Sequence, residues 1–99
     1  MEEMSKRFQM AVSMGDFNPE QAIRLYDEEL KEDPKNFAAM QNRGLCKLKI
    51  AIQNKNQQLL EDSKVDFRNA IKTADETGIK GFPIAEANLK WAEETTFDQ

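Results

Sequence analysis

The sequence predicts an all-α fold of five helices, arranged as two antiparallel helix hairpins and a C-terminal capping helix. Apolar residues recur every three or four positions along the chain, and no segment alternates with the two-residue period of a strand. Each of the 3 prolines suits a helix start or a helix stop. We expect a single domain spanning residues 1–99. Its helices are expected at residues 2–14, 18–33, 36–54, 57–77 and 83–96.

Clear start and stop signals bound the second expected helix. Asn18 can accept hydrogen bonds from the first backbone N–H groups of a helix, and Pro19 fits the first helical position. Asp33-Pro34 ends the helix, because Pro donates no backbone hydrogen bond and disfavours helical geometry in the residue before it. The first expected helix, which ends at Gly15, should pair with this one.

The third and fourth expected helices form the second hairpin. Small and apolar residues make a stripe on each. They are Phe37, Met40, Gly44, Leu48 and Ala51 on the third, widened by Leu45 and Ile52, and Leu60, Ser63, Phe67, Ala70, Ile71 and Ala74 on the fourth. The polar run at residues 53–58 predicts the turn between them, since a continuous rod of ~40 residues would far exceed the usual helix length. Gly44 weakens a helix interior, which indicates that another backbone comes close there.

The fifth expected helix begins at Pro83 and should cap the second hairpin, because the open end of a stack of helix pairs is apolar. One of its faces carries Ile84, Ala87, Trp91 and Thr95, with Leu89 and Ala92 beside it. We expect this face to be the packed one, so Trp91 is predicted to lie in the core. The alternative is an exposed patch at Trp91 and Phe97 that docks another protein.

Small, aromatic and proline residues recur in a set order along the two hairpins. They are Ala22, Tyr26, Pro34 and Gly44 and, more weakly, Ser63, Phe67 and Ala70. This order resembles that of tetratricopeptide repeat proteins, which stack antiparallel helix pairs with a period of about 34 residues. The spacing from Tyr26 to Phe67 exceeds that period, so the second hairpin should have longer helices or a longer loop. Met40 and Arg43 stand where the family has a large aromatic residue and Leu, and no Pro closes the second pair.

The resemblance implies a groove that binds an extended peptide or a partner helix, lined by the first helix of each pair. These helices are residues 2–14, 36–54 and 83–96. The implied groove residues on the middle helix are Ala38, Gln41, Asn42, Leu45, Leu48 and Lys49. Those expected to give specificity are Gln41, Asn42, Arg43 and Lys49. Some relatives clamp a C-terminal carboxylate with Lys and Asn side chains, but Met10 and the lone Lys90 leave that set incomplete here, so this ligand is not expected.

The composition argues against several kinds of chemistry. The chain has no His, which excludes a Ser-His-Asp triad, a Cys-His pair and a His-containing zinc site. Cys46, the single cysteine, lies on an apolar helix and is expected to be a small core residue rather than a nucleophile. The acidic run at residues 27–33 lacks the Gly turn of a calcium loop and is expected to be a solvated helix face. No cofactor and no metal are expected.

Charge and hydropathy narrow the choice of partner and compartment. The net charge of −4 disfavours nucleic acid and anionic membranes. No apolar run is long enough to span a bilayer, and the single cysteine fits a reducing compartment, so a cytoplasmic protein is expected. These observations favour a non-enzymatic adaptor or scaffold that binds a protein segment. The alternative is a structural subunit that buries the same surface in a homodimer or a larger assembly.

Overall fold

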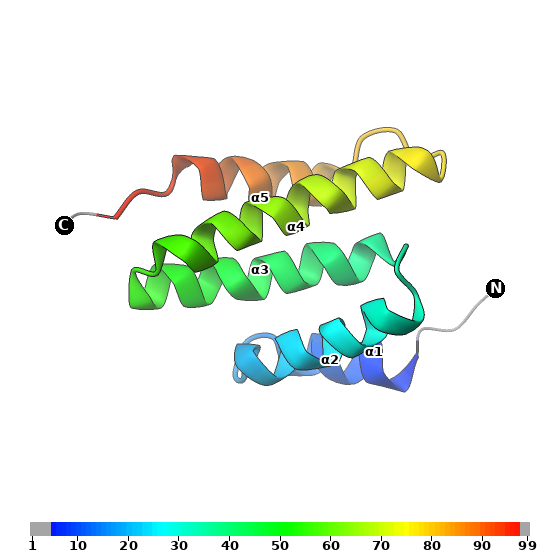
Figure 1. Ribbon diagram of the computed structural model, residues 1–99, viewed down its shortest axis with the longest axis horizontal. Coiled ribbons are helices and arrows are strands. Elements are labelled where there is room, and N and C mark those ends of the chain that lie inside the picture. The colour runs from blue at the N-terminus through cyan, green and yellow to red at the C-terminus, as the bar shows by residue number, and fades with distance from the viewer. Residues whose placement is uncertain (1–4, 98–99) are drawn as a thin grey trace.

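The computed structural model describes residues 5–97, which form five helices (Figure 1). They are α1 (Lys6–Met14), α2 (Pro19–Glu32), α3 (Phe37–Asn54), α4 (Gln57–Glu76) and α5 (Pro83–Glu94). These residues contain no strand, and none of their helices is long and apolar enough to cross a membrane. The all-α class and the order of the helices are therefore confirmed. Residues 2–4 of the first predicted helix lie outside the described residues.

Successive helices run in opposite directions, so the chain reverses at each connection (Figure 1). Each helix packs against the next one along the chain, and the interface between α3 and α4 is the most extensive. α3 contacts α2 on one side and α4 and α5 on the other. It is therefore the central helix of the molecule.

Asparagine side chains start three of the helices. Asn18, Asn36 and Asn56 each accept a hydrogen bond from the backbone N–H three residues later, at 3.3, 3.0 and 3.0 Å. Each bond satisfies a donor that the first helical turn leaves without a partner. Lys55 adopts left-handed geometry (φ 53°) and reverses the chain between α3 and α4. The turn predicted within residues 53–58 is thus confirmed.

Two groups of buried side chains form the core, and α3 contributes to both. The first group joins α1, α2 and α3 and contains Phe8, Ala11, Ala22, Tyr26, Ala39 and Cys46. Within it, the rings of Phe8 and Tyr26 meet edge to face, with centroids 5.8 Å apart. The second group joins α3, α4 and α5 and contains Leu48, Ala51, Leu60, Phe67 and Ala92. The two halves of the molecule are therefore held together by α3.

Most of the residues expected to define the two hairpins are buried. They are Ala22, Tyr26, Gly44, Ser63, Phe67 and Ala70. Pro34 is exposed and follows directly after the end of α2. At Gly44, an added Cβ would lie 2.9 Å from Cε1 of Phe67 and 3.0 Å from Cβ of Asp66, both on α4. The close approach of another helix that Gly44 predicts is confirmed, and that helix is α4.

The predicted packed face of α5 is wrong for Ile84 and Trp91, whereas Ala92 and Leu89, predicted beside it, do pack against the core. Trp91 is 44% exposed and Ile84 is 56% exposed, whereas the buried residues are Ala85 and Ala92. Small side chains let α5 lie close to its neighbours, and the larger ones remain at the surface. Both stripes of α5 have helical spacing, so periodicity alone could not tell which of them packs.

Candidate functional site

One stripe of α3 is left open by its neighbours. It consists of Ala38, Asn42, Leu45, Lys49 and Ile52, and we call it the α3 stripe. Successive members are four, three, four and three positions apart, so they lie in line along one side of the helix. All five side chains are half-buried or exposed, whereas most of the α3 residues next to them are buried, namely Ala39, Gln41, Gly44, Cys46, Leu48, Ile50 and Ala51. The α3 stripe is therefore a surface on which a second elongated element could lie.

A hollow of about 140 Å³ opens beside the α3 stripe, between α1 and α3. Its lining consists of Val12, Gly15, Asp16, Tyr26, Asn42, Leu45, Cys46 and Lys49. An apolar cavity of about 150 Å³ accommodates a molecule of benzene. This hollow, which we call the first hollow, therefore has room for about one apolar side chain of a partner.

A second hollow, of about 420 Å³, lies at the C-terminal end of the α3 stripe. Its lining comes from the end of α3 and from the end of α5, namely Ile52, Lys55, Trp91, Glu94, Thr95, Thr96 and Phe97. Trp91 and Ile52 expose apolar surface there. The sequence placed Trp91 in the core, but the structure places it in this surface hollow instead.

The structure divides the predicted groove residues into two sets. Ala38, Asn42, Leu45 and Lys49 lie on the α3 stripe. Gln41 and Leu48 do not, because packing against the helices on the other side of α3 buries them to 2% and 0% exposure. The prediction that these two side chains face an open groove is wrong. Ile52 was predicted only to widen the apolar stripe of this helix, not to line the groove, although one further step of the groove spacing would have reached it.

Lys49 links the α3 stripe to the connection between α1 and α2. Its Nζ lies 2.9 Å from Oδ1 of Asp16. The hydrogen bond and the positive charge of Lys49 lower the pKa of the Asp16 carboxyl below its usual value. Both side chains are well exposed, so water and salt screen the pair. A partner that offered its own carboxylate to Lys49 would face only this weak competition.

The two buried titratable groups of the first hollow are both neutral at pH 7. Burial raises the pKa of the Cys46 thiol, and the nearby charge of Lys49 only partly offsets this effect. Burial also raises the pKa of Tyr26 to about 12, with a smaller opposing contribution from a hydrogen bond with Asn42. A protonated thiol is a poor nucleophile, because the thiolate is the reactive form. The Cys46 thiol is therefore a weak nucleophile at pH 7.

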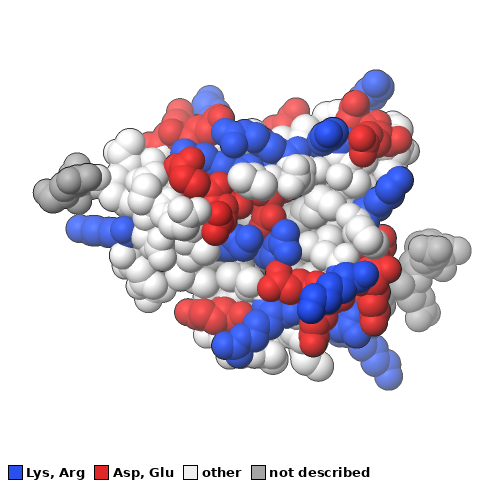
Figure 2. Space-filling model, in the orientation of Figure 1, with Lys and Arg blue, Asp and Glu red and all other residues white. Residues whose placement is uncertain are grey.

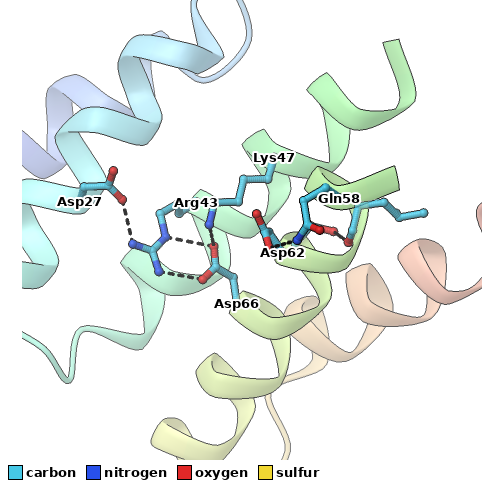
Figure 3. Close-up of polar contacts among 8 residues, drawn as sticks. Asp27, Arg43, Lys47, Gln58, Asp62 and Asp66 are labelled. Carbon is cyan, nitrogen blue, oxygen red and sulfur yellow. Dashed lines mark hydrogen bonds and ion pairs between the residues drawn. The ribbon is translucent and has the colours of Figure 1, made fainter. Parts of the chain in front are cut away.

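Arg43 points away from the α3 stripe and is engaged within the fold (Figure 3). Its Nε and Nη2 donate hydrogen bonds of 3.0 and 2.7 Å to the two carboxylate oxygens of Asp66, and its Nη1 donates one of 2.8 Å to Asp27. Lys47 Nζ lies 3.1 Å from the same Asp66 carboxylate. Burial disfavours the charged guanidinium, but the two carboxylates outweigh this effect and raise the pKa of Arg43. The structure therefore ties Arg43 to α2 and α4, not to the predicted groove.

Charges of both signs are interspersed over the face of the molecule drawn in Figure 2. Such a mixture is typical of a solvated surface, whereas nucleic-acid binding relies on a concentrated basic patch. Within residues 5–97, no group of three or more Cys, Asp or Glu side chains is placed to hold a metal ion. The open α3 stripe and its two hollows are therefore one candidate binding surface, and a further hollow of about 430 Å³, lined by Arg68, Ile71 and Leu89 among others, lies between α4 and α5.

Comparison with known proteins identified no relative of the chain. No protein-family model, no curated protein and no solved structure matches it.

Proposed function

We propose that the chain is a non-enzymatic protein–protein interaction module whose α3 stripe binds one amphipathic helix of a partner protein. The observation that carries this proposal is the alternating four- and three-residue spacing of the open stripe, with one hollow beside it and a second at its C-terminal end. This is the spacing at which one helix packs along another. A partner helix would meet the stripe with apolar residues at the same spacing, and the hollows would receive its largest side chains.

A helix fits this surface better than an extended peptide does. Extended peptides that join a protein gain much of their affinity from main-chain hydrogen bonds. The α3 stripe offers two polar side chains, Asn42 and Lys49, and Lys49 already binds Asp16. In a helix the backbone N–H and C=O groups bond to one another, so a bound helix needs few main-chain hydrogen bonds from the α3 stripe. Asn42 and Lys49 would instead set the register of the helix, as single polar residues do in helix-to-helix seams.

The arrangement of helices is proposed to be tetratricopeptide-like. The reversal of direction at each connection, the burial of Ala22 and Tyr26, and the close approach of α4 at Gly44 support this proposal. In a stack of that kind α1, α3 and α5 share one side of the molecule, and the two hollows do lie between α1 and α3 and between α3 and α5.

Self-association is the second candidate function. Val12, Ile52 and Trp91 expose apolar surface around the α3 stripe, and a two-fold pair of chains could bury that surface as well as a partner helix could. Light scattering with size-exclusion chromatography at two protein concentrations separates the candidates. A monomer of 11.4 kDa leaves the stripe free for a partner. A dimer that Ile52→Asp dissociates would favour self-association.

Selection from a displayed library of helical peptides, with apolar residues at three- and four-residue spacing, tests partner binding. Peptides that bind the full chain should change the fluorescence of Trp91, the single tryptophan. Ile52→Asp should weaken their binding by about tenfold or more, because it places a charge in the contact. Val65→Asp makes the same change at an exposed β-branched residue of α4 and should leave binding unchanged. Equal binding by both variants, or a library that yields no binder, would contradict the proposal.

A further inference from the structure

The surface of α3 and α4 that α5 covers, which we call the seat of α5, contains a buried polar group without a partner among the described residues. Gln41, on α3, is 2% exposed, and its Nε2 has no hydrogen-bond partner among the described residues. Its Oε1 accepts a hydrogen bond of 3.3 Å from Nδ2 of Asn88, on α5. A buried N–H without a partner destabilises the arrangement that buries it. Movement of α5 away from α3 would let water reach Gln41 and remove this penalty.

Small side chains attach α5 to the rest of the molecule. Its fully buried residues are Ala85 and Ala92, and the larger contacts of this segment come from side chains that are only half-buried, namely Phe82, Leu89 and Phe97. By contrast, α1 buries the ring of Phe8 against Tyr26. Less apolar area is therefore lost when α5 leaves than when a helix with a fully buried aromatic anchor leaves.

The ion pair and the N-terminal capping that could hold α5 in place are also weak. Glu93 lies 3.6 Å from Arg68 of α4, and both side chains are more than half exposed. Exposed pairs of this kind contribute little to stability. Phe82 precedes α5 and provides no side-chain cap, whereas a Ser or Asn side chain caps each of the other four described helices.

The connection between α4 and α5 has the features of a hinge. Gly78 and Gly81 both have positive φ, 95° and 68°, a conformation that glycine adopts without strain. Residues 77–81 are exposed, so a change in their backbone angles disturbs little packing. The ring of Phe82 contacts Phe37 edge to face, with centroids 5.3 Å apart, and marks where the packed part of the chain resumes.

From these observations we infer that α5 is an exchangeable helix: it leaves α3 and α4 as a unit, and α5 of a second copy of the chain takes its place. A second copy is the occupant that fits this seat, because its α5 reproduces every contact of the first. It brings the same amide of Asn88 to Gln41 and the same charge of Glu93 to Arg68. The exchange also rebuilds the second hollow, with Trp91 supplied by the other copy. This inference does not depend on the proposed binding of a partner helix.

Native-state hydrogen exchange tests the opening of α5. Its amides should exchange at least about tenfold faster than the slowest amides of α3 and α4, and independently of low denaturant concentrations, because they open without global unfolding. Gln41→Leu removes the unpaired donor and should slow the exchange of α5. Gln53→Leu makes the same change at an exposed position of α3 and should leave that exchange unaltered. If α5 exchanges only together with α3 and α4, the inference is overturned.

Mixtures of isotope-labelled and unlabelled chains test the replacement itself. In the dimer fraction at high protein concentration, isotope-filtered NMR should detect contacts between α5 of one copy and α3 of the other.

Deletion of residues 79–81 leaves too short a connection for α5 to fold back on its own chain and should convert monomer into dimer. Dimers without such contacts between copies, or a shortened chain that stays monomeric, would overturn the inference.

Discussion

Gly44 shows how the absence of one side chain sets the distance between two helices. Gly44→Ala would place a Cβ 2.9 Å from the ring of Phe67, so α3 and α4 would have to separate. Ala favours a helix over Gly by about 1 kcal/mol, but overpacking of a core typically costs about 1–3 kcal/mol. We therefore expect Gly44→Ala to lower the free energy of unfolding, measured by denaturant titration of the helical circular dichroism signal.

Gly15 provides the matched control for this substitution. Its backbone is already in the right-handed helical region (φ −55°), and an added Cβ would come no closer than 3.5 Å to another atom outside its immediate neighbours. Gly15→Ala should leave stability unchanged or raise it by about 0.5 kcal/mol. An equal loss in the two variants would show that the close contact at Gly44 is not the cause.

Tyr26 should make the stability of the fold sensitive to alkaline pH. Burial raises its pKa from 10.0 to about 12, so the folded chain holds the phenolic proton more tightly than the unfolded chain does. Its contribution is complete below pH 10 and is lost as the pH rises from 10 to about 12, because the unfolded chain releases its proton first. Since Tyr26 is the single tyrosine, the ultraviolet absorbance of phenolate reports its titration directly.

Tyr26→Phe isolates this effect from every other change that alkaline pH causes in the chain. The difference in free energy of unfolding between the original chain and the variant should be constant below pH 10 and change steadily between pH 10 and 12. A difference that stays constant through that window, or a phenol that titrates near 10 in the folded chain, would contradict the burial of the hydroxyl group.

At the scale of elements, a partly buried ion cluster around Asp66 joins α2, α3 and α4. Asp66 is nearly buried and accepts hydrogen bonds from Arg43 while Lys47 lies close by (Figure 3). Asp66→Asn would leave two positive charges partly buried with only Asp27 as a counter-charge. Because the loss of one partner from a buried pair is strongly destabilising, we expect a loss of about 3 kcal/mol in the free energy of unfolding.

The same substitution at Asp75, also on α4, serves as the control. Asp75 pairs with Lys80 at 3.5 Å, and both side chains are mostly exposed. Asp75→Asn should change stability by about 1 kcal/mol at most. Similar effects of the two substitutions, measured by thermal or chemical unfolding, would mean that the ion cluster adds no more than a surface pair does.

At the scale of the whole molecule, α3 belongs to both groups of core side chains, so the two halves should unfold together. Phe8 lies in the first group and Phe67 in the second. Phe8→Ala and Phe67→Ala should each shift the whole transition of α1–α4 to lower denaturant, with losses of about 3–5 kcal/mol. Far-ultraviolet circular dichroism and the absorbance of Tyr26 should give coincident transitions. Two separate transitions in either variant would show that the halves unfold independently.

The positions of the helices could be predicted from the sequence because short-range chemistry sets them. Asn18 and Asn36 bind the backbone of the next turn, and Pro34 cannot continue a helix. The close contact of another helix at Gly44 could also be predicted, since a glycine inside a helix indicates a close neighbour. These effects act within a few residues, so one sequence is enough to predict them.

What faces outward was decided by the tertiary structure. Gln41 and Leu48 have the same spacing as the open stripe but are covered by the helices beyond them, and Trp91 lies outside because Ala85 and Ala92 pack instead. Helical periodicity tells which residues share a side of a helix, whereas the neighbouring helices determine which side is buried. The sequence by itself therefore determined the helices and part of the α3 stripe. The packing of α4 and α5 against α3 decided which of its residues remain open to a partner.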